Sequence, residues 1–168
     1  DCGRCHSCGV GAPGCAPLAG CGRDLELYFD GGSRGNPGLA GSGAVIYLAG
    51  TTEEVWTGSV FVGICETNNV AEYRGLLSGL SAAEKIRGKS LMVKGDSKLV
   101  INQVQNIWRV NKEHLLPHCN DAKKLLGKIA NPKLEHVRRE HNTRADALAN
   151  AAMDTRRTRT AYVCPCKG

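Results

Sequence analysis

The sequence has no hydrophobic run long enough to cross a membrane. Of its 168 residues 42% are hydrophobic and only 5% are aromatic, and no apolar run approaches the roughly 18–20 residues that a membrane-spanning helix needs. The N-terminus also lacks the apolar core of a signal peptide. We therefore expect one soluble, intracellular globular domain of ordinary size, in the nucleus or the cytoplasm, with no membrane partner. The chain begins with Asp rather than Met, which is consistent with a fragment or processed piece of a longer protein.

The cysteines lack the second half of a zinc-binding pattern. Five of the nine lie in residues 1–23, which open with CxxCxxC, but no second CxxC or HxxxH follows at the expected distance. Few residues there could pack into a core, so we expect residues 1–23 to be a disordered extension rich in Gly and Cys. A zinc or other thiolate site is the alternative, and a disulfide framework is less favoured in an intracellular setting. Cys65 and Cys119 are expected to be free, buried thiols.

Basic residues are scarce in the first half of the chain and abundant in the second. Residues 24–108 carry seven Lys and Arg against nine Asp and Glu, whereas residues 109–144 carry nine against four. Residues 155–168 carry four basic residues and no acidic one, and we expect them to form a basic C-terminal tail. An acidic half beside a basic half suggests a cation site next to a surface that meets a polyanion, although a solvated basic face without a partner explains the charge equally well.

The hydrophobic pattern predicts an α/β domain over residues 24–154. Three apolar runs of strand length come first, the second and third joined by a short turn that favours an antiparallel hairpin. Periods of three to four residues then alternate with further strands, which is typical of a layered fold with a mixed sheet. Pro117 either kinks its helix or marks a restart. Strands are expected at 25–29, 42–49, within 53–64, at 90–94 and at 133–138, and helices at 69–88, 97–107, about 112–129 and within 140–154.

Four carboxylates lie near the ends of these elements, namely Asp30, Glu72, Asp96 and Asp146. Each has a purely structural interpretation as a turn former or helix cap, and Asn69 with Glu72 has the spacing of a capping box, as does Thr143 with Asp146. If the four converged, they would repel one another unless cations neutralised them. The sequence pattern alone leaves both interpretations open.

Four motifs in this order and spacing, DGGSRGNPG, TNNVAEY, GDS and NTRADALAN, resemble the type 1 ribonuclease H family over about residues 25–154. The resemblance implies a ribonuclease H-like fold, a five-stranded mixed sheet flanked by helices, with the first strand central and adjacent to the fourth. It also implies that Asp30, Glu72, Asp96 and Asp146 bind two Mg²⁺ ions, for which Mn²⁺ can substitute, and that the enzyme hydrolyses the RNA strand of RNA–DNA hybrids. A non-catalytic binding module of a retroelement polyprotein is the alternative, and the chain is expected to be a monomer or a domain of a larger polyprotein.

The same resemblance suggests which residues contact the hybrid. Glycines let backbone groups approach a sugar closely, and the basic segment would follow the DNA phosphates through Lys112, Lys123 and Lys124. His141 lies in the loop where the family often has a catalytic histidine, with product release as its expected role. The basic, Trp-rich insertion of the family's fullest form is absent near Trp108. The substrate-binding candidates are Gly31, Gly32, Ser33, Gly35, Asn36, Asn68, Asn69 and Arg139.

Overall fold

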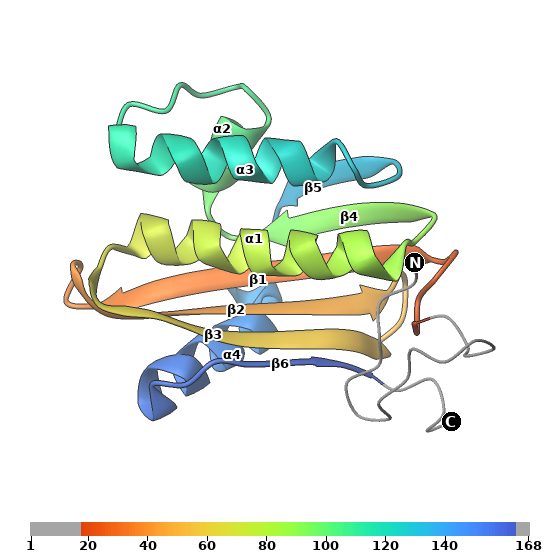
Figure 1. The fold of residues 1–168 in the computed structure, drawn as a ribbon, viewed down its shortest axis with the longest axis horizontal. Helices are drawn as coiled ribbons and strands as arrows, with labels where there is room; N and C mark the ends of the chain where they lie inside the picture. The colour runs from red at the N-terminus through yellow and green to blue at the C-terminus, as the bar shows by residue number, and fades with distance from the viewer. Residues whose placement is uncertain (1–17, 164–168) are drawn as a thin grey trace.

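Six strands form one mixed sheet with helices on both faces in the computed structural model, which describes residues 18–163 (Figure 1). The strands are β1 (Asp24–Arg34), β2 (Gly38–Leu48), β3 (Glu54–Glu66), β4 (Ser90–Gly95), β5 (Pro132–His136) and β6 (Arg159–Tyr162). The helices are α1 (Asn68–Ile86), α2 (Lys98–Val104), α3 (Leu116–Leu126) and α4 (Thr143–Thr155), with 3₁₀ turns η1 (Glu113–Leu115) and η2 (Arg139–His141).

The strand order is β5-β4-β1-β2-β3-β6, so β1 lies in the middle of the sheet beside β4. β1 pairs antiparallel with β2 and parallel with β4. The pairing with β4 ends at Phe29, which lies opposite Gly95, whereas the pairing with β2 continues to Arg34. The edge of β1 beyond Phe29 is therefore open on its β4 side, and the functional residues gather at this step.

Helix α1 covers one face of the sheet and α4 covers the other, while α3 packs on α1 and α2 (Figure 1). Both sheet-covering helices approach the strands at glycines. A Cβ on Gly75 of α1 would lie 2.6 Å from the carbonyl oxygen of Asp30, and one on Gly41 of β2 would lie 2.7 Å from the carbonyl oxygen of Ala149. No side chain can stand between backbones at such distances, so these glycines fix how deeply the two helices sit.

The core fills the space between the sheet and α1, α2 and α3. Its largest fully buried side chains include Tyr73 of α1 and Phe29 of β1. The Tyr73 hydroxyl donates to the side-chain oxygen of Gln103 at 2.6 Å, which satisfies both polar groups inside the core. Cys119 is buried as predicted, but Cys65 is exposed, because it lies between Gly63 and Glu66, where the pairing of β3 with β2 is interrupted by a register shift.

Two differences from the expected architecture involve the ends of the domain. The sheet has six strands rather than five, because β6 in the expected basic tail pairs antiparallel with β3 through Trp56 and Tyr162. At the other end, Leu18 is only 3% exposed and joins the core, so ordered structure begins before residue 24. The rest of the extension, including the CxxCxxC motif, lies outside the described residues, and its disorder and zinc binding stay predictions. Among the described residues no helix is long and apolar enough to cross a membrane.

Local boundaries also differ from the expected ones. β1 runs to Arg34, so Asp30 lies within the strand and not at its end. The expected helix over about 112–129 is divided into η1 and α3, and Pro117 lies in the first turn of α3, which supports the restart interpretation. The segment between α2 and η1, which contains Trp108, holds no additional helix.

Candidate active site

Asp30 projects from the step at which β4 stops pairing with β1. Its carboxylate accepts a hydrogen bond from the backbone N–H of Gly31 at 2.9 Å, and the residue is only 7% exposed. Gly31 is required beside it, because a Cβ there would collide with the backbone of Ala71 in α1. The strand and the helix are in this way held close enough for their carboxylates to share one site.

Glu72 comes from the second turn of α1. The N-cap of this helix is Thr67, whose hydroxyl accepts from the N–H of Val70 at 3.3 Å. The capping-box interpretation of Asn69 and Glu72 is therefore wrong, and Glu72 lies beyond the first turn of the helix. Since Glu72 does not cap the helix, its carboxylate is available to the cluster.

Asp96 follows the last residue of β4 and precedes the N-cap of α2. Ser97 caps that helix by accepting from the N–H of Val100 at 3.2 Å. The Nε2 atom of His136, at the end of β5, lies 3.2 Å from the carbonyl oxygen of Asp96. His136 was not predicted from the sequence, because only the parallel pairing of β4 and β5 brings it beside Asp96.

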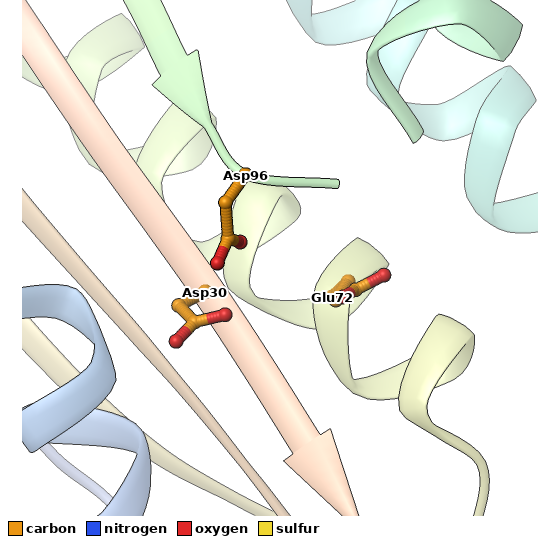
Figure 2. A group of neighbouring side chains, drawn as sticks. All are labelled: Asp30, Glu72 and Asp96. Atoms are coloured by element: carbon orange, nitrogen blue, oxygen red, sulfur yellow. The ribbon is translucent and has the colours of Figure 1, made fainter. Parts of the chain in front are cut away.

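Three carboxylates converge at this point. Asp30, Glu72 and Asp96 each offer an oxygen within 4.8 Å of the others (Figure 2). Burial, followed by the charge of Asp96, raises the pKa of Asp30 from 3.8 to about 8. Burial also raises the pKa of Glu72 from 4.5 to about 7, against a lowering hydrogen bond from Ser97 and the charge of Arg139. A cluster that resists ionisation to this degree is one that a cation would stabilise.

Asp146 lies in the first turn of α4 and faces the same cavity. Its hydrogen bond and its charge further raise the pKa of Asp30. The capping box expected for Thr143 is wrong, because α4 begins at Thr143 and its N-cap is Asn142. Asn142 instead donates to the carbonyl oxygen of Phe29 at 2.9 Å, which joins the start of α4 to β1. The cavity, of about 610 Å³, is lined by Asp30, Gly31, Gly32, Ser33, Arg34, Asn68, Glu72, Asp96, Arg139, Asp146, Ala149, Asn150 and Met153.

Several predicted substrate-binding residues lie at the rim of this cavity. The backbone N–H of Ser33 donates to the Asn68 side-chain oxygen at 2.8 Å, and the N–H of Asn68 donates to the Asn36 side-chain oxygen at 3.0 Å. Gly35, at φ +121, forms the turn that presents Asn36. The Ser33 hydroxyl is buried without a hydrogen-bond partner among the described residues, which marks it as a group able to meet a ligand.

Two of the predicted residues lie elsewhere. His141 is exposed and lines a separate cavity of about 320 Å³ together with Tyr28 and Arg144, so the structure does not bring it to the carboxylates. Asn69 follows Asn68 in the chain but lines a third cavity, of about 450 Å³, together with Trp108, Lys112 and residues of α2. Arg139, in contrast, does line the carboxylate cavity.

Three polar residues of the site were not predicted from the sequence, namely His136, Arg34 and Asn150. Asn150 lies four residues after Asp146 on α4, and its side-chain nitrogen lies 3.4 Å from the Asp146 carboxylate. This i, i+4 spacing is the signal that could have identified it, because such residues are neighbours on a helix. His136 reaches the site through the pairing of β4 and β5, and Arg34 contacts Asn150 because α4 packs on the sheet, neither of which the local sequence indicates.

Comparisons with known proteins agree with this geometry. Residues 28–152 match the family described as reverse transcriptase-like. The chain is 45% identical over 130 residues to the bifunctional protein Rv2228c of Mycobacterium tuberculosis, covering 77% of this chain and 35% of that protein. It is 40% identical over 130 residues to ribonuclease HI of Halobacterium salinarum, covering 77% of this chain and 64% of the enzyme.

Solved structures give the same result. The N-terminal RNase H domain of Rv2228c superposes with a TM-score of 0.76 at 42% identity, covering 79% of this chain and 95% of that one. RNase H1 of Halobacterium salinarum gives a TM-score of 0.74 at 39% identity over 79% and 98%. LC11-RNase H1, solved in complex with an RNA/DNA hybrid, gives 0.72 at 33% identity over 79% and 98%.

The mixed sheet carries α1 and α4 on opposite faces, and its carboxylates gather where β1 continues beyond the end of β4. These features define a ribonuclease H-like domain with an acidic site of the kind that binds divalent cations. The chain belongs to the type 1 ribonuclease H family. It spans about a third of the length of its mycobacterial relative and about two thirds of the halobacterial one.

The residues present fit a divalent cation of the kind on which this family depends. The donors that converge, Asp30, Glu72 and Asp96, are all carboxylate oxygens, which hard cations prefer. The unfavourable ionisation of Asp30 and Glu72 in the absence of a cation supports the same conclusion.

Proposed function

We propose that the protein is an endonuclease that hydrolyses the RNA strand of RNA–DNA hybrids, using two Mg²⁺ ions for which Mn²⁺ can substitute. The observation that carries the proposal is the convergence of the Asp30, Glu72 and Asp96 oxygens within 4.8 Å of one another, at the bottom of a cavity rimmed by Ser33 and Asn68. A site for cations at the base of a cavity, with hydrogen-bonding groups around it, suits a phosphodiester with a ribose beside it.

Asp30, Glu72, Asp96 and Asp146 would hold the metal ions. When bound there, divalent ions supply Lewis acids that activate a water molecule and stabilise the charge that develops on the scissile phosphate. Three of these carboxylates lie on rigid elements, namely β1, α1 and α4. The fourth, Asp96, lies in the turn after β4, which the contact between the His136 ring nitrogen and the Asp96 carbonyl oxygen holds in place. Arg139, whose charge lowers the pKa of Glu72, contributes a positive group at the same wall.

The rim would distinguish the RNA strand. Asn36 and Asn68 each use the side-chain oxygen to accept a backbone N–H, so the side-chain NH₂ groups are the parts that can donate to a substrate hydroxyl. The Ser33 hydroxyl can both donate and accept there. At Gly32 an added Cβ would meet only the end of Met153, at 3.9 Å, so the backbone is open on this side and a sugar can come close.

The DNA strand would lie over the groove formed by Asn69, Trp108 and Lys112. Trp108 is 47% exposed and offers an aromatic face, and Lys112 can contact a phosphate. Lys124 is exposed on α3, while Lys123 donates to Asn106 at 2.6 Å and would contact a phosphate only after leaving that hydrogen bond.

Cleavage of matched substrates tests the proposal. The chain with Mg²⁺ is expected to cut the RNA strand of a hybrid and to cut duplex RNA and duplex DNA far more slowly. Asp96→Asn should remove cleavage, because it takes ligand charge from the cluster, while Asp121→Asn on the exposed face of α3 should retain it. Equal cutting of duplex DNA, or hybrid binding without any cleavage, would contradict the proposal, and the second result would favour the non-catalytic module.

A further inference from the structure

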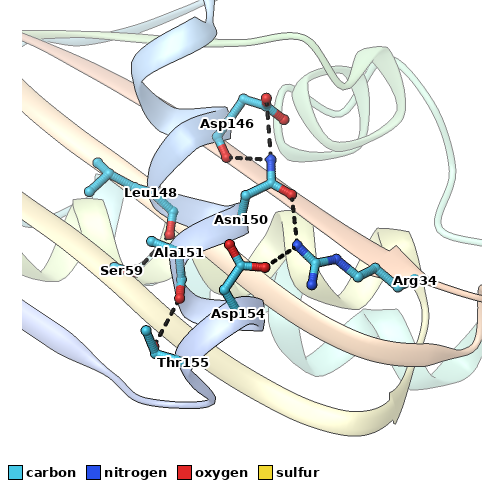
Figure 3. A network of polar contacts seen from close by, with 8 residues as sticks. All are labelled: Arg34, Ser59, Asp146, Leu148, Asn150, Ala151, Asp154 and Thr155. Carbon is cyan, nitrogen blue, oxygen red and sulfur yellow. Dashed lines mark hydrogen bonds and ion pairs between the residues drawn. The ribbon is translucent and has the colours of Figure 1, made fainter.

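The polar network around Asn150 links the last residue of β1 to Asp146 (Figure 3). One nitrogen of the Arg34 guanidinium donates to the Asp154 carboxylate at 2.7 Å and to the Asn150 side-chain oxygen at 3.3 Å. The Asn150 side-chain nitrogen donates to the Asp146 carbonyl oxygen at 3.1 Å and lies 3.4 Å from the Asp146 carboxylate oxygen Oδ2. A continuous chain of contacts therefore runs from Arg34 to one carboxylate of the proposed metal site.

This network fixes which way the Asn150 amide faces. A guanidinium carries only donors, so the Asn150 atom that faces Arg34 must be the oxygen. The NH₂ group is then turned toward Asp146, where it can donate to the carboxylate. The Asp146 carbonyl oxygen accepts from the same NH₂ group, so the amide is held at both ends. Loss of Arg34 would release the oxygen end and leave the NH₂ group less firmly held beside the carboxylate.

Stability does not explain the network. The side chains of Arg34 and Asp154 are 45% and 62% exposed, and ion pairs this open to water contribute little to folding. Asp146, in contrast, is the site carboxylate that lies outside the group of oxygens within 4.8 Å of one another. Its carboxylate meets Asp30 on one side, and the Asn150 NH₂ group is a contact that can hold it from the other side.

We propose that Arg34, Asn150 and Asp154 are positioning residues that hold the Asp146 carboxylate ready for a divalent cation. This inference rests on the proposed metal-dependent function. It has an unusual consequence for Arg34, because a positive charge at the rim of a cation site should by itself weaken cation binding. If Arg34 acts through Asn150, its removal should weaken cation binding, whereas a purely electrostatic effect of Arg34 would make cation binding tighter on its removal.

The test is calorimetric titration of Mn²⁺ into the full chain without nucleic acid, comparing wild type with Arg34→Met, Asn150→Leu, the double variant and Arg34→Lys. We expect Arg34→Met and Asn150→Leu each to raise the Kd for Mn²⁺ about tenfold, the usual scale for groups that orient a metal ligand. The double variant should be no weaker than the weaker single variant, because both changes break one network. Arg34→Lys, which retains a donor, should recover part of the affinity.

Arg157→Met is the matched control, since it removes the same charge from an exposed position just after α4. It should leave the Kd for Mn²⁺ unchanged. Arg34 is exposed, so its variants are expected to fold, and circular dichroism checks this. Unchanged or tighter Mn²⁺ binding by Arg34→Met would overturn the inference, as would an additive double variant or an equal loss in Arg157→Met.

A second readout uses hybrid cleavage at saturating hybrid. In Arg34→Met the Mg²⁺ concentration for half-maximal rate should rise about tenfold, while the rate at saturating Mg²⁺ stays near that of wild type. A lower rate at every Mg²⁺ concentration, with an unchanged half-maximal concentration, would contradict positioning. The Mn²⁺ titration needs no catalysis, so absence of cleavage in wild type would contradict the proposed function without deciding the role of Arg34.

Discussion

The side-chain oxygen of Asn36 accepts the backbone N–H of Asn68 at 3.0 Å, which ties the turn after β1 to the start of α1. Asn68 in turn accepts the N–H of Ser33 at 2.8 Å, so the two asparagines brace three backbone segments around one rim of the carboxylate cavity. The same residues therefore serve both interpretations that the sequence left open, as turn and cap formers through their oxygens and as potential substrate donors through their NH₂ groups.

The first prediction concerns this rim. Asn68→Ala removes the acceptor of the Ser33 N–H and the NH₂ donor together, and we expect the KM for hybrid to rise about tenfold, corresponding to roughly one hydrogen bond of about 1–1.5 kcal/mol. Steady-state cleavage of a hybrid across substrate concentrations measures it, with Asn120→Ala on the exposed face of α3 as the control. A KM equal to that of wild type would show that Asn68 has only a structural role.

The second prediction concerns repulsion among the carboxylates. The charge of Asp96 raises the pKa of both Asp30 and Glu72, so Asp96→Asn should raise the melting temperature in metal-free buffer. For a chain of this size each kcal/mol corresponds to about 2–4 °C, and we expect a gain of that order. Thermal melts in EDTA measure it, with Asp121→Asn unchanged. A lower melting temperature for Asp96→Asn would mean that the cluster is not strained without metal.

The third prediction is the pH dependence of stability. The pKa of Asp30 is raised from 3.8 to about 8, so between these values the folded protein binds more protons than the unfolded chain does. Stability from this group is therefore complete below pH 4 and is lost as the pH rises through 8. In metal-free thermal melts, the contribution of Asp30 to stability should fall from pH 5 to pH 8, and Asp30→Asn should reduce this fall. Added Mn²⁺ should offset it, because cations bind the ionised carboxylate. A metal-free melting temperature that rises over this range equally in both proteins would disprove it.

The fourth prediction concerns the basic helix α3. Lys124→Glu should weaken hybrid binding and reduce the slope of log K against log salt by about 0.9 for each phosphate that the protein no longer neutralises. Lys123→Glu should behave similarly and should also break the hydrogen bond to Asn106. Binding in the presence of EDTA over a range of salt concentrations measures both. Lys85→Glu, at the opposite end of α1 from Glu72, is the control, and an equal change of slope there would show only a general charge effect.

The fifth prediction concerns the start of the domain. Leu18 is only 3% exposed within the core, so Leu18→Ala should lower the free energy of unfolding by about 2–4 kcal/mol. Chemical denaturation measures this change, and Leu116→Ala, at a position 46% exposed, should cost much less. Equal costs would indicate that Leu18 does not contribute to the core in solution.

The sequence was sufficient for most element types and for the identity of the carboxylates. Asp30, Glu72 and Asp96 could be selected because the surrounding motifs are specific, and the structure brings their oxygens together. The hydrophobic pattern predicted the hairpin of β2 and β3, whereas the place of β1 beside β4 was implied by the family resemblance. Element boundaries were less accurate, since pairing with β2 carries β1 four residues past Asp30.

The tertiary structure alone decided which side chains complete the site. His136 reaches the Asp96 backbone through strand pairing, His141 faces a separate cavity, and Arg34 contacts Asn150 across more than a hundred residues of chain. A local pattern of hydrophobic and polar residues determines which face of an element is buried, because burial is repeated along the element. It does not determine which elements lie side by side, because that depends on how closely their backbones can pack. Helix α1 approaches Asp30 at Gly75, and α4 approaches β2 at Gly41, in both places because a glycine has no side chain in the way.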